Sequence, residues 1–402
     1  MKLSEELAWR GFVAQHTFSA ITNLDEKKRN FYLGVDPSDD SMTIGNLAAL
    51  MMCKVFIRHG YRPTLLVGGA TGMIGDPKET GERESKTIEE IERNKKGIHE
   101  QFVRIMGTDV PLVDNYDWFR DIKFLPFLRD IGKQFSMTQL LDRDFVKTRI
   151  GEGRSGISYA EFSYSLIQGY DFLYLFREHD VTLQLCGADQ WGNSVSGVHL
   201  VKRLENAEVN VWSTPLILNK TTGRKFGKSE DNAIWLDPIK TSPYQFYQFW
   251  LNVDDAGVID YLKIYTELDR EKIDAIANSH AGDPAARTAQ RALAYEVTKI
   301  VHGADVADNV VHVTNVLFGA DNIRDLSDEA LDILAKEIPT VRVGMTAVEA
   351  LVETDIANSN SEALRLIGGG AVSVNGNKIT EDQVINEKAL VKKGKNSFVL
   401  VK

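Results

Sequence analysis

Short apolar runs that alternate with helical patterns limit the fold of this chain more than any other feature. The run FYLGVD, from Phe31, is followed by a helical pattern from about Ile44 to Gly60, and the run TLLVGG, from Thr64, by a Gly-rich segment. Strands separated by helices in this order pair in parallel through crossover connections. The first part of the chain is therefore predicted to be an α/β domain built on a parallel sheet.

The same alternation continues to about Leu236 and then stops. The helical pattern SKTIEEIERNKKGIHEQFVRIM, the run VPLVDN, the helical pattern AEFSYSLIQGYDFLYLFREH, the run VTLQLCGAD and a further helix extend the sheet. Four helical patterns follow with no strand between them, and from about Thr340 short helices and strands surround Gly-rich turns. We therefore expect an α/β domain over residues 1–236, an α-helical domain over residues 237–325 and a small α+β module over residues 340–402.

Two segments outside this alternation carry predictions of their own. Residues 1–30 are expected to form two helical segments, the first of them LSEELAWRGFV. Residues 124–141, FLPFLRDIGKQFSMTQLL, are expected to form one apolar helix. Such a helix is either a core helix or, because of its apolar density, an interface with a second copy of the chain.

Composition excludes several classes of protein. The 402 residues are too many for one ordinary core, and the net charge of −10 argues against unselective binding of nucleic acid, although not against a local basic patch. No apolar run is long enough to cross a membrane, and the N-terminus, MKLSEELAWRGF, lacks the apolar core of a signal peptide. Cys53 and Cys186 are expected to be reduced, buried thiols of a cytoplasmic protein.

The turn between the first strand and its helix, DPSDDSMTIGN, is a candidate nucleotide site. Ligands collect at the carboxyl ends of parallel strands, where the free N–H groups of helix N-termini favour phosphate. Gly45 lets a ligand approach the backbone closely, and Thr43 and Asn46 are short hydrogen-bonding residues beside it. An ordinary capped helix is an equally good interpretation of this stretch taken by itself.

Two other segments place charged residues next to glycine. GGATGMIGDP lacks the Gly-Lys-Ser/Thr of a phosphate-binding P-loop, and Asp76 at its end is either a turn residue or an anion for a substrate ammonium group. KFGKSEDN brings Lys225 and Lys228 into one Gly-containing loop. Such a loop either closes over a polyphosphate or is a solvated basic turn.

Polar residues also occur within one strongly apolar helical pattern and directly after one apolar strand. Tyr164, Gln168 and Asp171 lie at positions i, i+4 and i+7, and so on one face of a helix. They indicate either a pocket for a small polar molecule or a surface stripe. Asp189 and Gln190 follow the strand TLQL at its carboxyl edge, where an aspartate is otherwise an ordinary helix cap.

Taken in order, YLGVDPSDDSMTIGN, GGATGMIGDP, EFSYSLIQGYDF, CGADQWGN and KFGKS resemble bacterial tyrosyl-tRNA synthetases, which are class I aminoacyl-tRNA synthetases. TIGN stands in place of a His-Ile-Gly-His signature and KFGKS in place of a Lys-Met-Ser-Lys-Ser signature. The segment SEALRLIGGGAVSVNGNKI resembles the S-four-like RNA-binding domain that ends these enzymes. The resemblance covers essentially the whole chain. It implies a Rossmann-like catalytic domain, an α-helical anticodon-stem-binding domain and an S-four-like RNA-binding domain.

The resemblance also implies roles for particular residues. Those expected to hold the substrate tyrosine are Tyr32, Asp76, Tyr164, Gln168, Asp171 and Gln190. Those expected to border ATP and the adenylate are Gly34, Asp36, Ser38, Gly45, Gly187, Asp189 and Lys228. Those expected to act on the phosphates during the reaction are Thr43, Asn46, Lys225 and Lys228. Thr43 departs from the family pattern, since it replaces the first signature histidine and cannot carry charge.

By this resemblance the chain would activate L-tyrosine with ATP and Mg²⁺ and transfer the tyrosyl group to tRNA(Tyr), as a homodimer in the cytoplasm. The cations of its C-terminal module gather in VKKGK, so a local RNA-binding patch is expected there rather than a broad basic face. The alternatives are a tryptophanyl-tRNA synthetase, which has the same catalytic fold, and a non-catalytic RNA-binding paralogue, for which Thr43 is the only indication.

Overall fold

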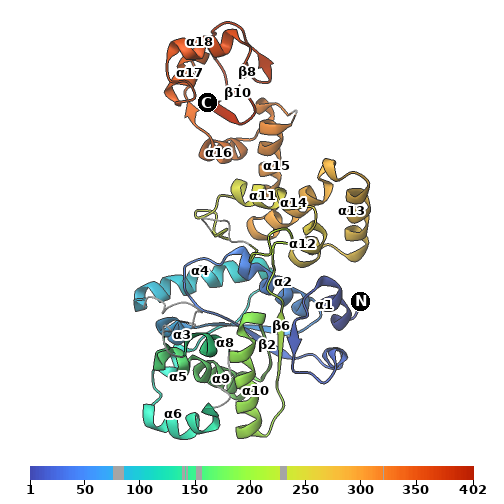
Figure 1. Ribbon diagram of the computed structural model, residues 1–402, viewed down its shortest axis with the longest axis vertical. Coiled ribbons are helices and arrows are strands. Elements are labelled where there is room, and N and C mark those ends of the chain that lie inside the picture. Colours follow the sequence, from blue (N-terminus) through green and yellow to red (C-terminus); the bar gives the residue numbers. More distant parts are fainter. Residues whose placement is uncertain (76–85, 138–140, 142–143, 151–155, 227–232, 320) are drawn as a thin grey trace. The chain divides into compact units, whose positions relative to one another are not determined.

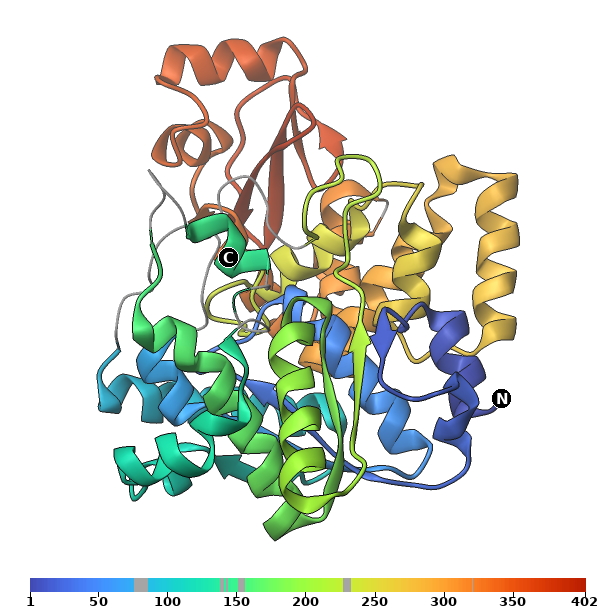
Figure 2. The same cartoon turned by 60° about the horizontal axis from the view of Figure 1, so that its bottom comes forward.

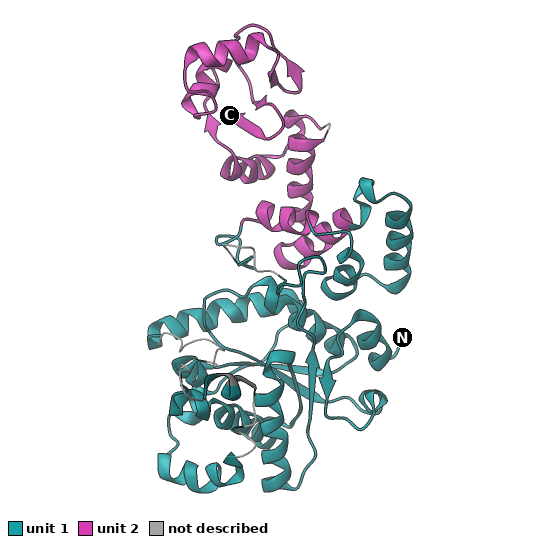
Figure 3. Cartoon of the chain, in the orientation of Figure 1, with its two compact units in different colours: residues 1–241, 253–289 teal, residues 242–252, 290–402 magenta. Residues whose placement is uncertain are grey.

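The computed structural model describes the chain except residues 76–85, 138–140, 142–143, 151–155, 227–232 and 320. Its contacts divide the chain into two compact units, residues 1–241 with 253–289 and residues 242–252 with 290–402 (Figure 3). The helices that follow residue 236 are thus divided between the units, and the three domain boundaries remain a prediction. Among the described helices, none is both long enough and apolar enough to span a membrane.

The first unit is built on one sheet (Figure 1). Its strands, in spatial order, are β1 (Gln15–His16), β6 (Asn210–Thr214), β5 (Val181–Gly187), β2 (Asn30–Val35), β3 (Arg62–Val67) and β4 (Leu112–Asp114). All neighbours pair in parallel except β1, which runs antiparallel to β6. The chain extends this sheet from β2 in both directions, first to β3 and β4 and then to β5 and β6. The predicted α/β fold with a parallel sheet is therefore confirmed, and its switch point lies between β2 and β5.

Helices and short 3₁₀ turns connect these strands. The helices of the first unit are α1 (Leu3–Arg10), α2 (Ile44–Arg58), α3 (Gly69–Ile74), α4 (Ile88–Met106), α5 (Tyr116–Phe119), α6 (Phe124–Asp130), α8 (Asp144–Arg149), α9 (Tyr159–His179), α10 (Trp191–Glu205), α12 (Val258–Tyr265) and α13 (Arg270–Gly282). The 3₁₀ turns are η1 (Ile21–Asp25), η2 (Gly132–Gln134), η3 (Ala188–Gln190) and η4 (Pro284–Ala286).

Helices cover both faces of the sheet, with α2 and α4 on one side and α9 and α10 on the other (Figure 1). Helices α9 and α10 lie side by side (Figure 2). Consecutive residues of β2 contact the two layers: Phe31 packs on Phe56 of α2, with 5.8 Å between ring centroids, and Tyr32 packs on Phe172 of α9, at 5.3 Å. Successive side chains of a strand point to opposite faces, so a strand covered on both faces is apolar throughout.

The second unit contains a helical part and a small sheet. Its helices are α11 (Pro243–Leu251), α14 (Thr288–His302, which begins at the boundary), α15 (Ala304–Phe318), α16 (Asp328–Glu337), α17 (Ala347–Glu353) and α18 (Asn360–Gly368), with a 3₁₀ turn η5 (Ile323–Asp325). Its strands, in spatial order, are β7 (Thr340–Val341), β11 (Ser397–Val401), β10 (Ala389–Lys393), β8 (Val372–Val374) and β9 (Asn377–Lys378). The predicted small α+β module is confirmed.

Two local predictions are wrong. The second helical segment expected within residues 1–30 is instead β1 followed by η1, because β1 pairs with β6 at the sheet edge, where Ala14 N donates to Ser213 O at 2.9 Å. The single helix expected over residues 124–141 is interrupted: α6 ends at Asp130, η2 follows, and Phe135 is extended with φ −101°. Residues 138–140 of that prediction lie outside the described residues.

The Gly-rich segment after β3 differs from a phosphate-binding loop. Residues Gly69–Ile74 form the short helix α3, whose first backbone N–H groups already have partners. Gly69 N donates to Asp114 Oδ1 at 2.9 Å, and Ala70 N donates to Asn115 Oδ1 at 2.7 Å. The end of β4 therefore caps α3, and this helix N-terminus is closed to an anion.

Candidate active site

A cavity of about 360 Å³ opens in the first unit at the carboxyl ends of β2 and β5. The predicted site residues that line it are Tyr32, Gly34, Asp36, Ser38, Thr43, Gly45, Asn46, Tyr164, Gln168, Asp171, Gly187, Asp189, Gln190 and Lys225. Asp76 and Lys228, which were predicted to join them, lie outside the described residues. Segments that are far apart in the sequence thus meet at the switch point of the sheet, where a ligand is expected.

Two of the most buried groups of this cavity are Tyr32, 1% exposed, and Asp171, 2% exposed. Asp171 accepts hydrogen bonds from Asn115 Nδ2 at 3.1 Å and from Trp118 Nε1 at 3.0 Å. The hydroxyl of Tyr32 has no hydrogen-bond partner among the residues that the structure describes. Buried hydroxyl groups are nearly always hydrogen-bonded, so that of Tyr32 is free for a ligand.

The protonation of this pair follows from its burial. Burial raises the pKa of Asp171 to about 8, although its two N–H donors favour the carboxylate. Burial, and then the neighbouring Asp171 carboxyl, raise the pKa of Tyr32 well above its usual range, so its phenol stays neutral. A carboxyl and a neutral hydroxyl in an apolar surrounding suit a ligand hydroxyl that donates to one and accepts from the other.

A polar network holds Asp36 at the end of β2. Tyr164 Oη donates to Asp36 Oδ2 at 2.7 Å, and Thr71 Oγ1 donates to Asp36 Oδ1 at 2.8 Å. Asn115 Nδ2 donates to Thr71 Oγ1 at 3.3 Å, which links this network to Asp171. A Cβ atom at Gly68 would lie 2.5 Å from Asp36 Oδ1 and 2.0 Å from Thr71 Oγ1, so this close approach requires glycine.

Gln168, on the same face of α9, adds an acceptor to the cavity. Its Nε2 lies 3.5 Å from Ser194 Oγ, while its Oε1 is buried and has no partner among the described residues. A carboxylate, a phenol oxygen and an amide oxygen are all groups that a ligand ammonium can donate to. The Asp36, Tyr164 and Gln168 side chains therefore suit a cationic part of a ligand.

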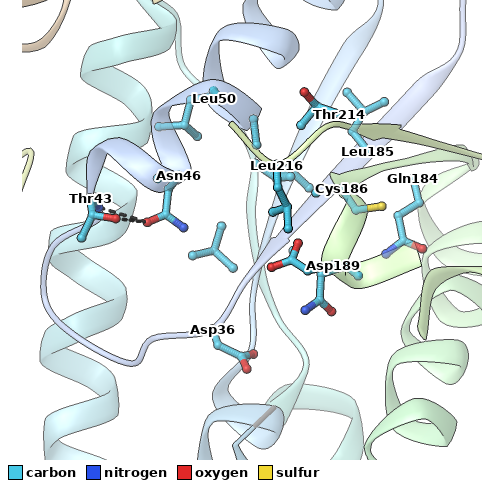
Figure 4. A pocket seen from close by; sticks show the side chains of 18 of the residues that line it. Asp36, Thr43, Asn46, Leu50, Gln184, Leu185, Cys186, Asp189, Thr214 and Leu216 are labelled. Carbon is cyan, nitrogen blue, oxygen red and sulfur yellow. Dashed lines mark hydrogen bonds between the residues drawn. The ribbon is translucent and has the colours of Figure 1, made fainter. Parts of the chain in front are cut away.

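The N-terminus of α2 forms another wall of the cavity (Figure 4). Thr43 donates to Asn46 Oδ1 from its backbone N at 3.0 Å and from its hydroxyl at 3.1 Å. This pairing uses the amide oxygen of Asn46 and leaves its amide nitrogen on the cavity side (Figure 4). A Cβ atom at Gly45 would contact only Thr43 Oγ1, at 3.3 Å, so the backbone there is open to a ligand. Both interpretations of this stretch apply: the helix is capped, and its N-terminus faces the cavity.

Lys225 and Asp189 provide charges of opposite sign. Asp189, after β5, lies across the cavity from Asn46 (Figure 4), and its Oδ2 is 3.9 Å from Lys225 Nζ. Both side chains are about half exposed, so this ion pair is weak and a ligand phosphate can replace the carboxylate as the partner of Lys225.

Several residues of the cavity were not predicted from the sequence. They are Thr71, Gln184 and Thr214, which line it, and Asn115 and Trp118, which hold Asp171. Gln184 pairs in register with Tyr32, and the side-chain oxygens of Gln184 and Thr214 are buried without a partner among the described residues. Asn115 follows β4 directly and Gln184 interrupts the apolar run TLQLC, so these two positions carried a signal in the sequence, although not the identity of their partners.

Comparison with known proteins agrees with this geometry. Residues 24–319 match the family model described as tRNA synthetases class I (W and Y), and residues 330–402 match the model of the Tyrosine--tRNA ligase SYY-like C-terminal domain. Tyrosine--tRNA ligase 1 of Enterococcus faecalis is 42% identical over 420 residues, covering 100% of this chain and 99% of that protein. Tyrosine--tRNA ligase 2 of Bacillus cereus is 41% identical over 422 residues, covering all of both chains. A C-terminally truncated mitochondrial tyrosyl-tRNA synthetase of Aspergillus nidulans superposes with a TM-score of 0.71 at 30% identity, covering 79% of this chain and 94% of that one.

A parallel sheet with its cavity at the switch point, and a family match over more than half of the chain, define a class I aminoacyl-tRNA synthetase. The family model includes members for tryptophan and for tyrosine, and the C-terminal match separates the two. The chain belongs to the tyrosine–tRNA ligase family, to which its full-length relatives also belong.

Proposed function

We propose that this chain is a tyrosine–tRNA ligase that joins L-tyrosine to ATP, releases pyrophosphate, and passes the tyrosyl group to the 3′-terminal ribose of tRNA(Tyr). One observation carries the proposal: the buried Tyr32–Asp171 pair faces the same cavity as the N-terminus of α2 and Lys225. A phenol-binding end and a phosphate-binding end in one cavity are what tyrosyl-adenylate needs.

The tyrosine end is proposed to use the polar groups around α9. The substrate hydroxyl donates to Asp171 and accepts from Tyr32, whose hydroxyl has no other partner in the described part of the chain. The substrate ammonium is proposed to lie against Tyr164 and Gln168, and Gln190 to border the substrate. Asp76, which lies outside the described residues, keeps the ammonium-binding role expected from the sequence. Gln184, in register with Tyr32, is added to this group because its buried amide oxygen also has no partner among the described residues.

The nucleotide end is proposed to use the loops at the strand ends. Asp189 and the Gly187 backbone bind the ribose, while Gly34, Asp36 and Gly45 border the adenylate. The phosphates are met by Ser38, Thr43, Asn46, Lys225 and Lys228.

In the first step a carboxylate oxygen of tyrosine attacks the α-phosphorus of ATP, and the bond to the bridging oxygen of pyrophosphate breaks. No side chain is needed as a nucleophile, so catalysis consists of positioning and of stabilising the charge that develops on the phosphate oxygens. The lysines and the amide of Asn46 supply that stabilisation. Thr43 carries no charge and can donate its one hydroxyl hydrogen to a phosphate only by releasing Asn46 Oδ1, which leaves the lysines as the main source of positive charge.

Mg²⁺ is proposed to enter with the nucleotide. This ion usually takes substrate phosphates and water with at most one or two carboxylates, so it can enter bound to the phosphates of ATP while Asp189 stays with the ribose. The ion would supply positive charge to the phosphate oxygens. The described side chains contain no group of three or more possible metal ligands, so the fit is to a phosphate-bound ion.

Three further parts of the proposal concern partners and location. The helices after residue 236 and the C-terminal module are proposed to hold tRNA(Tyr). The chain is proposed to act as a homodimer, because large apolar side chains are exposed on and after α6: Phe124 is 63% exposed and Leu125 74% exposed. Both cysteines are buried and free, which supports a cytoplasmic location.

The decisive experiment is amino-acid-dependent exchange of labelled pyrophosphate into ATP, run over the twenty amino acids. We expect exchange with tyrosine and none with tryptophan or phenylalanine at equal concentration. Exchange with tryptophan alone would support the related tryptophan enzyme, and absence of exchange with every amino acid would support a non-catalytic RNA-binding protein. Charging of a tRNA(Tyr) transcript then tests the second step separately.

A further inference from the structure

The segment that carries Lys225 is a short hairpin over residues 217–226. Leu218 and Lys225 form an antiparallel bridge, and Phe226 N donates to Ile217 O at 2.8 Å. Asn219 closes the turn, with its side-chain oxygen accepting from two backbone N–H groups at 2.7 and 3.0 Å. The backbone of Lys225 is therefore fixed within the hairpin, and the position of its ammonium group depends on where the hairpin is held.

Phe226, which is 5% exposed, attaches this hairpin to α12. Its ring centroid lies 4.3 Å from that of Tyr261 and 5.8 Å from that of Tyr265. Tyr261 and Tyr265 are one helical turn apart, so both rings lie on the same face of α12. Tyr261 Oη also donates to Leu218 O at 3.3 Å, and a Cβ atom at Gly257 would lie 2.6 Å from the Tyr261 ring. We call the rings of Phe226, Tyr261 and Tyr265 the aromatic anchor.

Helix α12 is itself held in place by Arg10 of α1. This guanidinium is 3% exposed and donates at 2.7, 2.8 and 2.9 Å to the carbonyl oxygens of Lys263, Thr266 and Leu268. Carbonyl groups at a helix C-terminus lack partners within the helix, so Arg10 satisfies them and fixes this end of α12. The aromatic anchor therefore connects the hairpin to a platform that belongs to the same compact unit.

Two polar contacts also join the turn of the hairpin to this platform. Lys220 Nζ lies 3.0 Å from Asp260 Oδ2, and Thr221 Oγ1 donates to Asp254 Oδ2 at 2.8 Å. Both contacts are solvent-exposed, and exposed ion pairs contribute little to stability. The buried rings therefore carry most of the attachment.

We propose that Tyr261 and Tyr265 are positioning residues for the ammonium group of Lys225 and act on it through Phe226. With Phe226 held against α12, the ammonium group of the preceding residue, Lys225, lies 3.9 Å from Asp189 Oδ2 in the cavity. The inference rests on the proposed role of Lys225 at the phosphates of ATP. It assigns to α12 a part in the activation step through Tyr261, which does not line the cavity, in addition to the place of Phe226 and Tyr265 in the cavity wall.

The first test compares Tyr261→Leu with Tyr261→Phe. Leucine removes the ring contact with Phe226 and the hydrogen bond to Leu218 O, whereas phenylalanine keeps the ring. We expect Tyr261→Leu to lower kcat/KM for ATP in pyrophosphate exchange by roughly tenfold or more, because small misplacements of a catalytic group are costly. Tyrosine affinity should change less than about twofold, since the variant leaves the Tyr32–Asp171 end intact. Tyr261→Phe should recover most of the activity.

A matched control is Tyr61→Leu, which truncates a tyrosine that is 2% exposed and packs edge-on to Phe56 at 5.2 Å, without a contact to the hairpin. It should lower the melting temperature by a similar amount and leave the ratio of the ATP and tyrosine parameters unchanged. If Tyr261→Leu gives the same pattern as Tyr61→Leu, Tyr261 acts only on stability and the proposal is wrong.

A double-mutant cycle tests whether the effect passes through Lys225. If the anchor acts by positioning that ammonium group, Tyr261→Leu should cost much less in the Lys225→Ala background than in the parent. Independent, multiplicative effects would overturn the proposal, as would an unchanged kcat/KM for ATP in Phe226→Leu, a milder variant of the same anchor. The parent chain distinguishes failure of the proposed function from failure of the anchor proposal. If the parent shows no tyrosine-dependent exchange, the proposed function is wrong. If it shows exchange, the variants test the aromatic anchor alone.

Discussion

At the residue scale, the most informative groups are the polar atoms that are buried without a partner among the described residues. Tyr32 Oη, Gln168 Oε1, Gln184 Oε1 and Thr214 Oγ1 are all of this kind, and all four residues line the cavity. Buried polar groups are nearly always hydrogen-bonded, so side chains of this kind in a cavity wall are available to the polar groups of a ligand. They therefore mark positions at which polar groups of a ligand are expected to bind, which the sequence motifs alone did not show.

The first prediction concerns Asp171→Ala. It removes the acceptor for the substrate hydroxyl, so we expect selectivity for tyrosine over phenylalanine to fall by roughly tenfold to a hundredfold, the equivalent of one unpaired buried polar group. The KM for ATP should change less than about threefold, because Asp171 contacts neither the N-terminus of α2 nor Lys225. Pyrophosphate exchange with each amino acid measures both. A variant that rejected phenylalanine as strongly as the parent would contradict the placement of the substrate hydroxyl.

The second prediction is a pH dependence of tyrosine binding. Burial raises the pKa of Asp171 to about 8 in the free protein, and the substrate hydroxyl donates best to the ionised carboxylate. Binding therefore releases a proton below pH 8, and tyrosine affinity should rise from pH 6 to pH 8 by roughly tenfold or more and then level off. Equilibrium dialysis with labelled tyrosine gives the profile. Asp171→Asn should bind weakly with a flat profile, whereas a parental profile in that variant would exclude Asp171 as the titrating group.

At the scale of elements, the sequence was most informative where a pattern was local. Helix α9 was predicted from its helical periodicity, and the strands β2, β3 and β5 were predicted from their continuous apolar runs, which are typical of strands covered on both faces. The prediction of a second helix within residues 1–30 was wrong because β1 is stabilised by pairing with β6, which lies almost 200 residues away in the sequence. The prediction of one helix over residues 124–141 was wrong because apolar density does not show where a helix ends, and α6 ends at Asp130.

The same limit applies to the site. Residues within motifs could be predicted, because each motif lies at a strand end or on one helix face. The contacts of Asn115 and Trp118 with Asp171 could not be predicted, since they join segments more than 50 residues apart and are visible only after folding.

The third prediction tests the exposed apolar surface of α6. Leu125→Glu places a charge on a side chain that is 74% exposed, so it should hardly affect the stability of a single copy. If this surface lies in the homodimer interface, the buried charge should weaken dimerisation by several kcal/mol. Analytical ultracentrifugation should show a dimer for the parent and a monomer for Leu125→Glu. Glu92→Lys, a charge change at an exposed position of α4, serves as the control. A monomeric parent, or a dimeric Leu125→Glu, would exclude this interface.

At the scale of the whole molecule, the cavity is confined to one compact unit. Every described residue that lines it precedes Thr266, and all of them belong to residues 1–241 or 253–289. The C-terminal module has a separate core, in which Val348, Leu351, Ile367, Val391 and Val399 pack together. Activation of the amino acid and recognition of tRNA are therefore expected to be separable.

The fourth prediction follows from that separation. A chain that ends at residue 339 should keep tyrosine-dependent pyrophosphate exchange within about threefold of the parent and lose charging of tRNA(Tyr). The truncation uncovers Leu331 and Leu334, which pack with Leu400, so circular dichroism and sedimentation should accompany the assay. Loss of both activities in a soluble, folded fragment would contradict the modular picture.

The position of the cavity in the first 265 residues also bears on how such a gene can change. On the proposed function, the residues that choose the amino acid precede the C-terminal module that is proposed to hold tRNA. Recombination within the reading frame could therefore join a catalytic part that selects one amino acid to a different RNA-binding part, without changing the sequence of either recognition surface.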